Sequence, residues 1–130
     1  MADLGIKAAC LAIVFIVSPV GAVDLPKGVL DAHWLVTNCG AVAKWKASNI
    51  SVGMAAEAGS CVGYLGGLAE TSQIMNSALP AKARACIQHE VRSDELAKVV
   101  LDYIKRRPAV IGDPRLVVSL AALAERYPCR

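Results

Sequence analysis

The chain has 130 residues, five cysteines, 55% hydrophobic and 5% aromatic residues, and a net charge of +3. This length fits one small domain and excludes a two-domain enzyme. The longest basic run is residues 105–107, so the charge pattern argues against a nucleic-acid-binding protein.

The first predicted element is a secretory signal peptide over residues 1–22. Lys7 precedes the apolar stretch 8–17, and small residues with a proline then lead to a Val-x-Ala cleavage site between Ala22 and Val23. The uncharged stretch 8–23 has 16 residues, whereas a bilayer needs about 20, so a retained membrane anchor is the weaker alternative. We expect cleavage, with no membrane contact afterwards for the domain of residues 23–130.

Two helices are predicted next, separated by a turn at residues 47–51. The first opens at Pro26, and its apolar stripe consists of Val29, Ala32, Val36, Cys39 and Ala43. The second covers residues 52–79 and stops at Pro80. Its stripe consists of Met54, Ala58, Cys61, Leu65, Leu68, Ser72, Met75 and Leu79.

Two further helices are predicted in the second half of the chain. Ser93 is the expected N-cap of the third, which ends before Pro108. Asp113 is the expected N-cap of the fourth, with Pro114 as its first residue. The fourth stripe consists of Leu116, Leu120, Leu123 and Tyr127. Because no segment shows sustained strand alternation, we expect an all-α fold, a compact bundle of about four helices in two helical hairpins.

Cysteine positions predict two disulfides. Loss of Cys10 with the signal leaves an even number of cysteines in an oxidising compartment. If the first hairpin turns near residue 50, Cys39 and Cys61 lie at equal distances from the turn and face each other. Cys86 and Cys129 flank the open end of the second hairpin. Of the three possible connectivities, geometry favours Cys39 with Cys61 and Cys86 with Cys129.

An ordered set of motifs carries a family resemblance. It consists of Cys61-Val-Gly63-Tyr64-Leu-Gly-Gly67, the mid-chain Cys86, a helix end Tyr103-Ile-Lys-Arg-Arg-Pro108, and the terminal Tyr127-Pro128-Cys129. In order and spacing, over about residues 35–129, this set resembles the Rap/Tai family of type VI secretion amidase immunity proteins. The family motif therefore falls on Gly63, Tyr64, Gly67, Pro108, Tyr127 and Pro128.

The resemblance implies a function without chemistry of its own. It implies an all-helical periplasmic protein, usually a homodimer, that binds a papain-like cysteine amidase acting on peptidoglycan and blocks its active-site cleft. No catalytic residue, metal or cofactor is then expected, and the cysteines are structural. The alternative from another class is a periplasmic helical chaperone or adaptor, and a small hydrolase is a third interpretation.

One pair of side chains is a candidate interface, and one glycine stripe is a candidate site of close helix packing. Trp34 and Trp45 are 11 residues apart, about three helical turns, so they share a helix face. That face is either buried within the domain or a dimer or effector surface anchored by tryptophan. Gly59, Gly63 and Gly67 form a stripe that would let another helix of the bundle approach closely.

Two chemical readings are set aside in favour of structural ones. Cys86-x-x-His89 has the spacing of zinc ligands, but no second ligand pair completes the set, and the oxidising compartment favours a disulfide. Tyr64 is expected to pack with its hydroxyl bonded rather than to act as an acid or base.

Overall fold

The computed structural model describes residues 30–45 and 49–129. The expected signal peptide and its cleavage site between Ala22 and Val23 lie outside these residues. Pro26 also lies outside them, but the prediction that the first helix opens there is wrong, because Asp31 has an extended backbone and is the N-cap of a helix that begins at Ala32. Within the described residues the chain forms four α-helices and two short 3-10 helices, so the predicted all-α fold is confirmed. No helix of the described residues is both long and apolar enough to cross a membrane.

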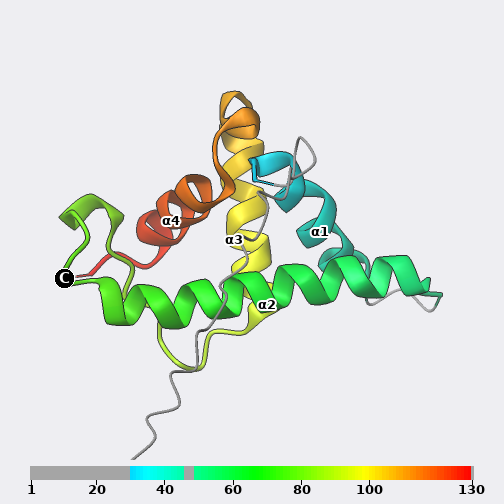
Figure 1. Cartoon of the computed structure of the whole chain (residues 1–130), viewed down its shortest axis with the longest axis horizontal. Helices are drawn as coiled ribbons and strands as arrows, with labels where there is room; N and C mark the ends of the chain where they lie inside the picture. The colour runs from blue at the N-terminus through cyan, green and yellow to red at the C-terminus, as the bar shows by residue number, and fades with distance from the viewer. Residues whose placement is uncertain (1–29, 46–48, 130) are drawn as a thin grey trace, which may run out of the picture.

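The first hairpin consists of α1 (Ala32–Lys44) and α2 (Val52–Met75). Each helix begins at a side-chain cap: the Asp31 carboxylate accepts from the His33 N–H, and the Ser51 hydroxyl accepts from the Met54 N–H. In Figure 1, α2 runs along the lower side of the molecule. The hairpin is closed by the predicted bridge between Cys39 and Cys61, whose Cα atoms are 5.1 Å apart.

The second hairpin consists of α3 (Ser93–Arg106), the 3-10 turn η2 (Pro108–Gly112) and α4 (Arg115–Arg126). A short 3-10 turn, η1 (Ala81–Ala83), precedes it. The predicted Cys86–Cys129 bridge closes its open end, with Cα atoms 4.9 Å apart. In Figure 1, α3 stands between α1 and α4 above α2, so it contacts all three other helices.

The two hairpins are joined where α1 and α4 begin. The Ala32 N–H donates to the Asp113 carbonyl at 2.9 Å, and the Arg115 N–H donates to the Leu30 carbonyl at 2.8 Å. These bonds explain one correction, because Asp113 is not the N-cap of α4. Its carbonyl is committed to α1, its backbone is extended, and Pro114 occupies the cap position instead.

Two other predicted helix ends are also wrong. Arg92, not Ser93, is the N-cap residue of α3, and no side chain caps this end. The Arg92 side chain binds Asp94 at 2.9 Å instead. The helix α2 ends at Met75 rather than at residue 79, because the side chain of Asn76, the next residue, is bound to the backbone of Ala85.

The core is built from one side of each helix around the buried Cys39–Cys61 bridge. Its largest fully buried side chains are Leu35, Leu65, Leu123 and Val100. The predicted stripe of α2 is buried at Ala58, Cys61, Leu65 and Ser72.

The predicted stripes of α1 and α4 are partly wrong. In α1, Val36 is 44% exposed while Leu35 is buried. In α4, Leu116 is 50% exposed while Val118 and Ser119 are buried. Residues 116–124 are apolar or small on every side of α4, so their spacing alone does not indicate which side faces the core.

Candidate partner-binding surface

A groove lies where the C-terminal end of α1 meets the first half of α2 and the first ten residues of α3. Its volume is about 940 Å³, and the buried disulfide contributes Cys39 to its lining. Val42 lines it from α1, and Trp45 lines it from the C-cap position directly after this helix. Trp45 is 50% exposed, so this large ring is available to a partner. We call this depression the Trp45 groove.

The two long walls of the Trp45 groove differ in chemistry. The α2 wall contains Ala58, Gly59 and Val62 and has no charged side chain. The α3 wall combines apolar residues with charged ones, including Lys98 and Asp102, which lie one helical turn apart. An apolar floor with a few charged groups at one edge is typical of a binding site for another molecule.

The structure gives the two predicted interface tryptophans different surroundings. Trp34 is half-buried, and its ring meets the Tyr64 ring edge-on with centroids 5.4 Å apart. The Arg115 guanidinium carbon lies 4.3 Å from the centroid of Trp34 and 4.8 Å from that of Tyr64. This cation–π cluster joins α1, α2 and α4. The Trp34 ring therefore packs mainly against other side chains of the domain, whereas the Trp45 ring is exposed to a partner.

The family-motif Tyr64 also links α2 to α4 through its hydroxyl. The Tyr64 hydroxyl donates to the Ser119 hydroxyl oxygen at 3.5 Å, and Ser119 is fully buried. This contact gives a buried polar group a partner. Tyr64 thus has a packing role in this structure.

No other helix among the described residues packs on the glycine stripe. Gly59, Gly63 and Gly67 all lie on the exposed side of α2. A Cβ atom added at any of them would meet no neighbouring atom within 4 Å. The expectation of close helix packing at these glycines within the bundle is therefore wrong. The side of α2 that bears Cys61 and Leu65 faces the core, and none of the described helices covers the three glycines.

The Tyr127-Pro128-Cys129 end of the chain is fixed at several points. The Cys86 N–H donates to the Tyr127 carbonyl at 2.8 Å, and Pro128 pairs with Ala85 in an isolated β-bridge. The Tyr127 hydroxyl donates to the Glu95 carboxylate at 3.1 Å. Burial is the main cause of a raised pKa of Tyr127, and the hydrogen bond to Glu95 raises this pKa further. These contacts hold the end of α4 against the start of α3.

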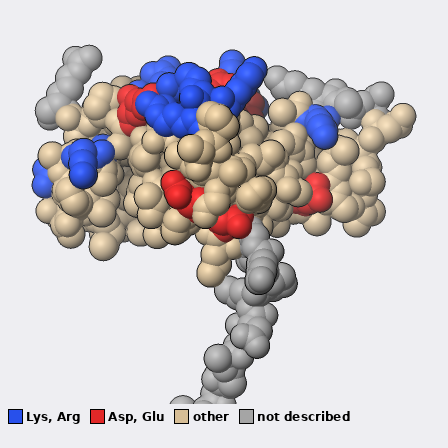
Figure 2. All heavy atoms as spheres, turned by 90° about the horizontal axis from the view of Figure 1, so that it is seen from above, with Lys and Arg blue, Asp and Glu red and all other residues tan. Residues whose placement is uncertain are grey.

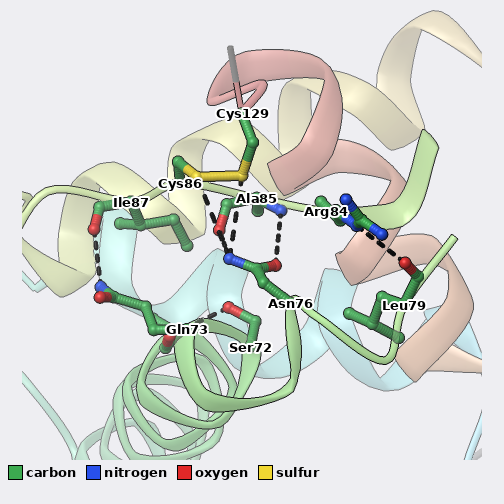
Figure 3. The surroundings of a disulfide bond; sticks show 10 residues. Ser72, Gln73, Asn76, Leu79, Arg84, Ala85, Cys86, Ile87 and Cys129 are labelled. Carbon is green, nitrogen blue, oxygen red and sulfur yellow. Dashed lines mark hydrogen bonds between the residues drawn. A yellow bond between two sulfur atoms is a disulfide. The ribbon is translucent and has the colours of Figure 1, made fainter. Parts of the chain in front are cut away.

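Asn76 is a structural residue that no sequence motif indicated. Its Nδ2 donates to the Ala85 carbonyl at 3.0 Å, and its Oδ1 accepts from the Ala85 N–H at 3.3 Å. Figure 3 shows Asn76 pointing from the end of α2 toward Ala85, below the Cys86–Cys129 bridge. Nearby, the Gln73 amide donates to the Ile87 carbonyl at 2.7 Å. The end of α2 thus anchors the segment that carries Cys86.

Charged side chains at the C-terminal end of α3 form ion pairs with the last turn of α4. Glu125 accepts from Arg106 at 2.8 Å and from Arg107 at 2.7 Å. The hydrogen bond from Arg106, with the charges of both arginines, holds the pKa of Glu125 below its ordinary value. Arg107 also lies over the Tyr103 ring, 4.3 Å from its centroid. Figure 2, viewed from above, shows Lys and Arg gathered on one part of the surface with acidic side chains beside them.

The described residues contain no group of three or more His, Cys, Asp or Glu side chains that could hold a metal ion. Cys86, the first residue of the zinc-like spacing, is joined to Cys129 in a disulfide.

Comparison with known families identifies the chain. The model of the Rap1a immunity proteins matches residues 31–129, which include all four helices and both disulfides. The chain belongs to the Rap1a immunity protein family, and the resemblance seen in the sequence is confirmed. Neither the curated proteins nor the solved structures gave a match. Family membership indicates an immunity protein that binds a secreted effector.

Proposed function

We propose that this protein is a periplasmic immunity protein that inhibits a papain-like peptidoglycan amidase delivered by a type VI secretion system. The observation that carries the proposal is the family match over residues 31–129. Two disulfides that close both hairpins suit an oxidising compartment. The expected signal peptide, cleaved between Ala22 and Val23, would deliver the domain there.

In this proposal the protein blocks the amidase cleft by shape and does no chemistry itself. The two hairpins are held by disulfides and by the bonds between α1 and α4, so a partner meets a preorganised surface. Preorganisation lowers the entropy cost of binding. Trp45 supplies an exposed aromatic anchor. We propose a homodimer as the functional form, on the basis of the family resemblance.

Co-expression in a bacterial periplasm tests the function. The full-length gene is expressed together with the amidase encoded by the adjacent gene, to which a periplasmic export signal is fused. We expect the protein to prevent lysis. A matched variant without residues 1–22 stays in the cytoplasm and should give no protection. Lysis in the presence of the full-length protein, with both proteins detected in the periplasm, would contradict the proposal.

The alternative is a periplasmic helical chaperone or adaptor. Exposed apolar side chains are the observation that favours it. Val52 is 88% exposed and Ile74 is 81% exposed, and a chaperone holds unfolded clients through such surfaces. A chaperone would suppress the aggregation of unrelated unfolded proteins, whereas an immunity protein would form one stoichiometric complex with its amidase. A light-scattering assay with a reduced model client distinguishes the two.

A further inference from the structure

The dimensions of the Trp45 groove match a short helix. Along α3 its lining extends from Ser93 to Asp102, and Val91 and Arg92 line it just before the helix. At 1.5 Å per residue the helical stretch is about 15 Å long, or nearly three helical turns. The opposite wall is also a helix, α2, so a helical occupant could pack against both walls with its side-chain ridges in their grooves.

The α2 wall permits an unusually close approach. Gly59 lines the groove, is exposed, and has open space where a Cβ atom would project. Its neighbours in the wall, Ala58 and Val62, are small. No charged residue occurs in α2 between Glu57 and Glu70. An occupant therefore meets an apolar surface on this side and can bring its backbone near α2.

The α3 wall determines the charges that an occupant needs. Lys98 and Asp102 are both exposed and lie four residues apart on α3. A complementary helix would carry one acidic and one basic side chain about one turn apart at the edge of its apolar face.

A second copy of the chain fits this requirement poorly. The described helices that expose large apolar side chains are α1, α2 and α4. Residues 34–43 of α1, 58–69 of α2 and 116–124 of α4 contain no charged side chain, so none of these stretches could pair with Lys98 and Asp102.

We propose that the Trp45 groove receives a three-turn amphipathic helix of the secreted effector. Its apolar side contacts Trp45, Val62 and the open position at Gly59, and its edge pairs with Lys98 and Asp102. This inference rests on the proposed function, because it names the surface through which the effector is held. The immunity protein then blocks the effector cleft and also holds a helix of the effector in the Trp45 groove.

Fluorine NMR of the intact protein tests the docking site. The protein has two tryptophans, so labelling with 5-fluorotryptophan gives two signals, which a Trp34→Phe variant assigns. The probe is the unlabelled amidase encoded by the adjacent gene. We expect the Trp45 signal to shift on binding and the Trp34 signal to keep its position. Hydrogen exchange of the amidase in the complex should show protection concentrated in one helix.

A pair of glycine variants gives the sharper test. Gly59→Leu fills the open position in the groove, whereas Gly67→Leu adds the same side chain to the exposed side of α2 two turns away and outside the groove lining. Both variants should fold with unchanged or higher thermal stability, because each removes a helix-interior glycine. We expect Gly59→Leu to weaken amidase binding roughly 10- to 100-fold and Gly67→Leu to leave it unchanged.

The outcomes separate this inference from the function on which it rests. If the wild-type protein forms no complex with the amidase, the proposed function is wrong. If a complex forms but Gly59→Leu binds as tightly as Gly67→Leu, or the Trp45 signal does not move, the groove proposal is wrong and the function stands. A Trp45 shift that depends on the concentration of the immunity protein alone would show a second copy in the groove and overturn the proposal.

Discussion

Asn76 offers the clearest test of how the two hairpins are joined. Its side chain supplies both a donor and an acceptor to the backbone of Ala85, which is 0% exposed. In the variant Asn76→Ala, the N–H and the carbonyl of Ala85 lose these partners in a place that water does not reach. The Asn76 amide also lies 3.8 Å from the Cys129 sulfur, so the bridge loses a polar neighbour.

The magnitude follows from the cost of leaving buried polar groups unpaired. At about 1–2 kcal/mol for each of the two unsatisfied groups, the variant should lose roughly 2–4 kcal/mol of unfolding free energy. For a domain of about 100 residues this corresponds to a decrease in Tm of roughly 10–25 °C. The disulfides remain, so the variant should still fold at room temperature.

Urea unfolding of the oxidised protein, followed by far-UV circular dichroism, measures this loss. Asn38→Ala is the matched control, because the Asn38 amide donates only to the Trp34 carbonyl within α1, at 2.9 Å. Its loss should cost at most about 0.5 kcal/mol, since alanine also favours the helix. If the two variants are equally stable, the Asn76–Ala85 contact does not hold the hairpins together and the reasoning is wrong.

Two more predictions concern the bridges and the C-terminal tyrosine. By chain entropy alone, loops of 22 and 43 residues make the Cys39–Cys61 bridge worth about 3.4 kcal/mol and the Cys86–Cys129 bridge about 4.0 kcal/mol. Replacing Cys39 and Cys61 by alanine also leaves a cavity at a fully buried site, which adds about 1–2 kcal/mol to the loss of stability. Urea unfolding should therefore find this double variant less stable than the Cys86/Cys129 double variant. The reverse order would show that loop length dominates. Because the pKa of Tyr127 is raised, its favourable contribution is complete below its ordinary pKa and is lost as pH rises through the raised value. Unfolding free energies measured above pH 10 should therefore fall more steeply in the wild type than in Tyr127→Phe, and parallel curves would contradict this.

The sequence was sufficient to predict features that depend on chain order and spacing. The pairing of Cys39 with Cys61 follows from their equal distances to the turn, and that of Cys86 with Cys129 from their places at the ends of one hairpin. The acidic start and basic end of α3 likewise mark a helix by local electrostatics. Each of these signals lies within one element or one hairpin.

Features that depend on packing between elements were beyond the sequence. The orientation of α4 was predicted incorrectly at Leu116, because a helix with apolar residues on every side has no unique buried face. Asn76 gave no signal, since its partner Ala85 is reached only through the path of the intervening turn. The Trp45 groove exists only once α1, α2 and α3 are assembled, although the tryptophan itself was recognised as a candidate anchor.

The two ends of α1 have different roles, one in stability and the other in binding. Its N-terminal half is tied to the other helices, with Trp34 in the cation–π cluster and Ala32 bonded to Asp113. Its C-terminal end carries the exposed Trp45. Substitutions in the first half should therefore affect stability, whereas substitution of Trp45 should affect binding.

The central claim, inhibition of a peptidoglycan amidase by binding, is tested most directly by titrating the purified protein into the amidase encoded by the adjacent gene and measuring peptidoglycan cleavage. The account predicts a linear loss of activity that reaches complete inhibition at one amidase per immunity chain, with no cleavage product from the immunity protein alone. Full amidase activity in the presence of excess, oxidised immunity protein would contradict it.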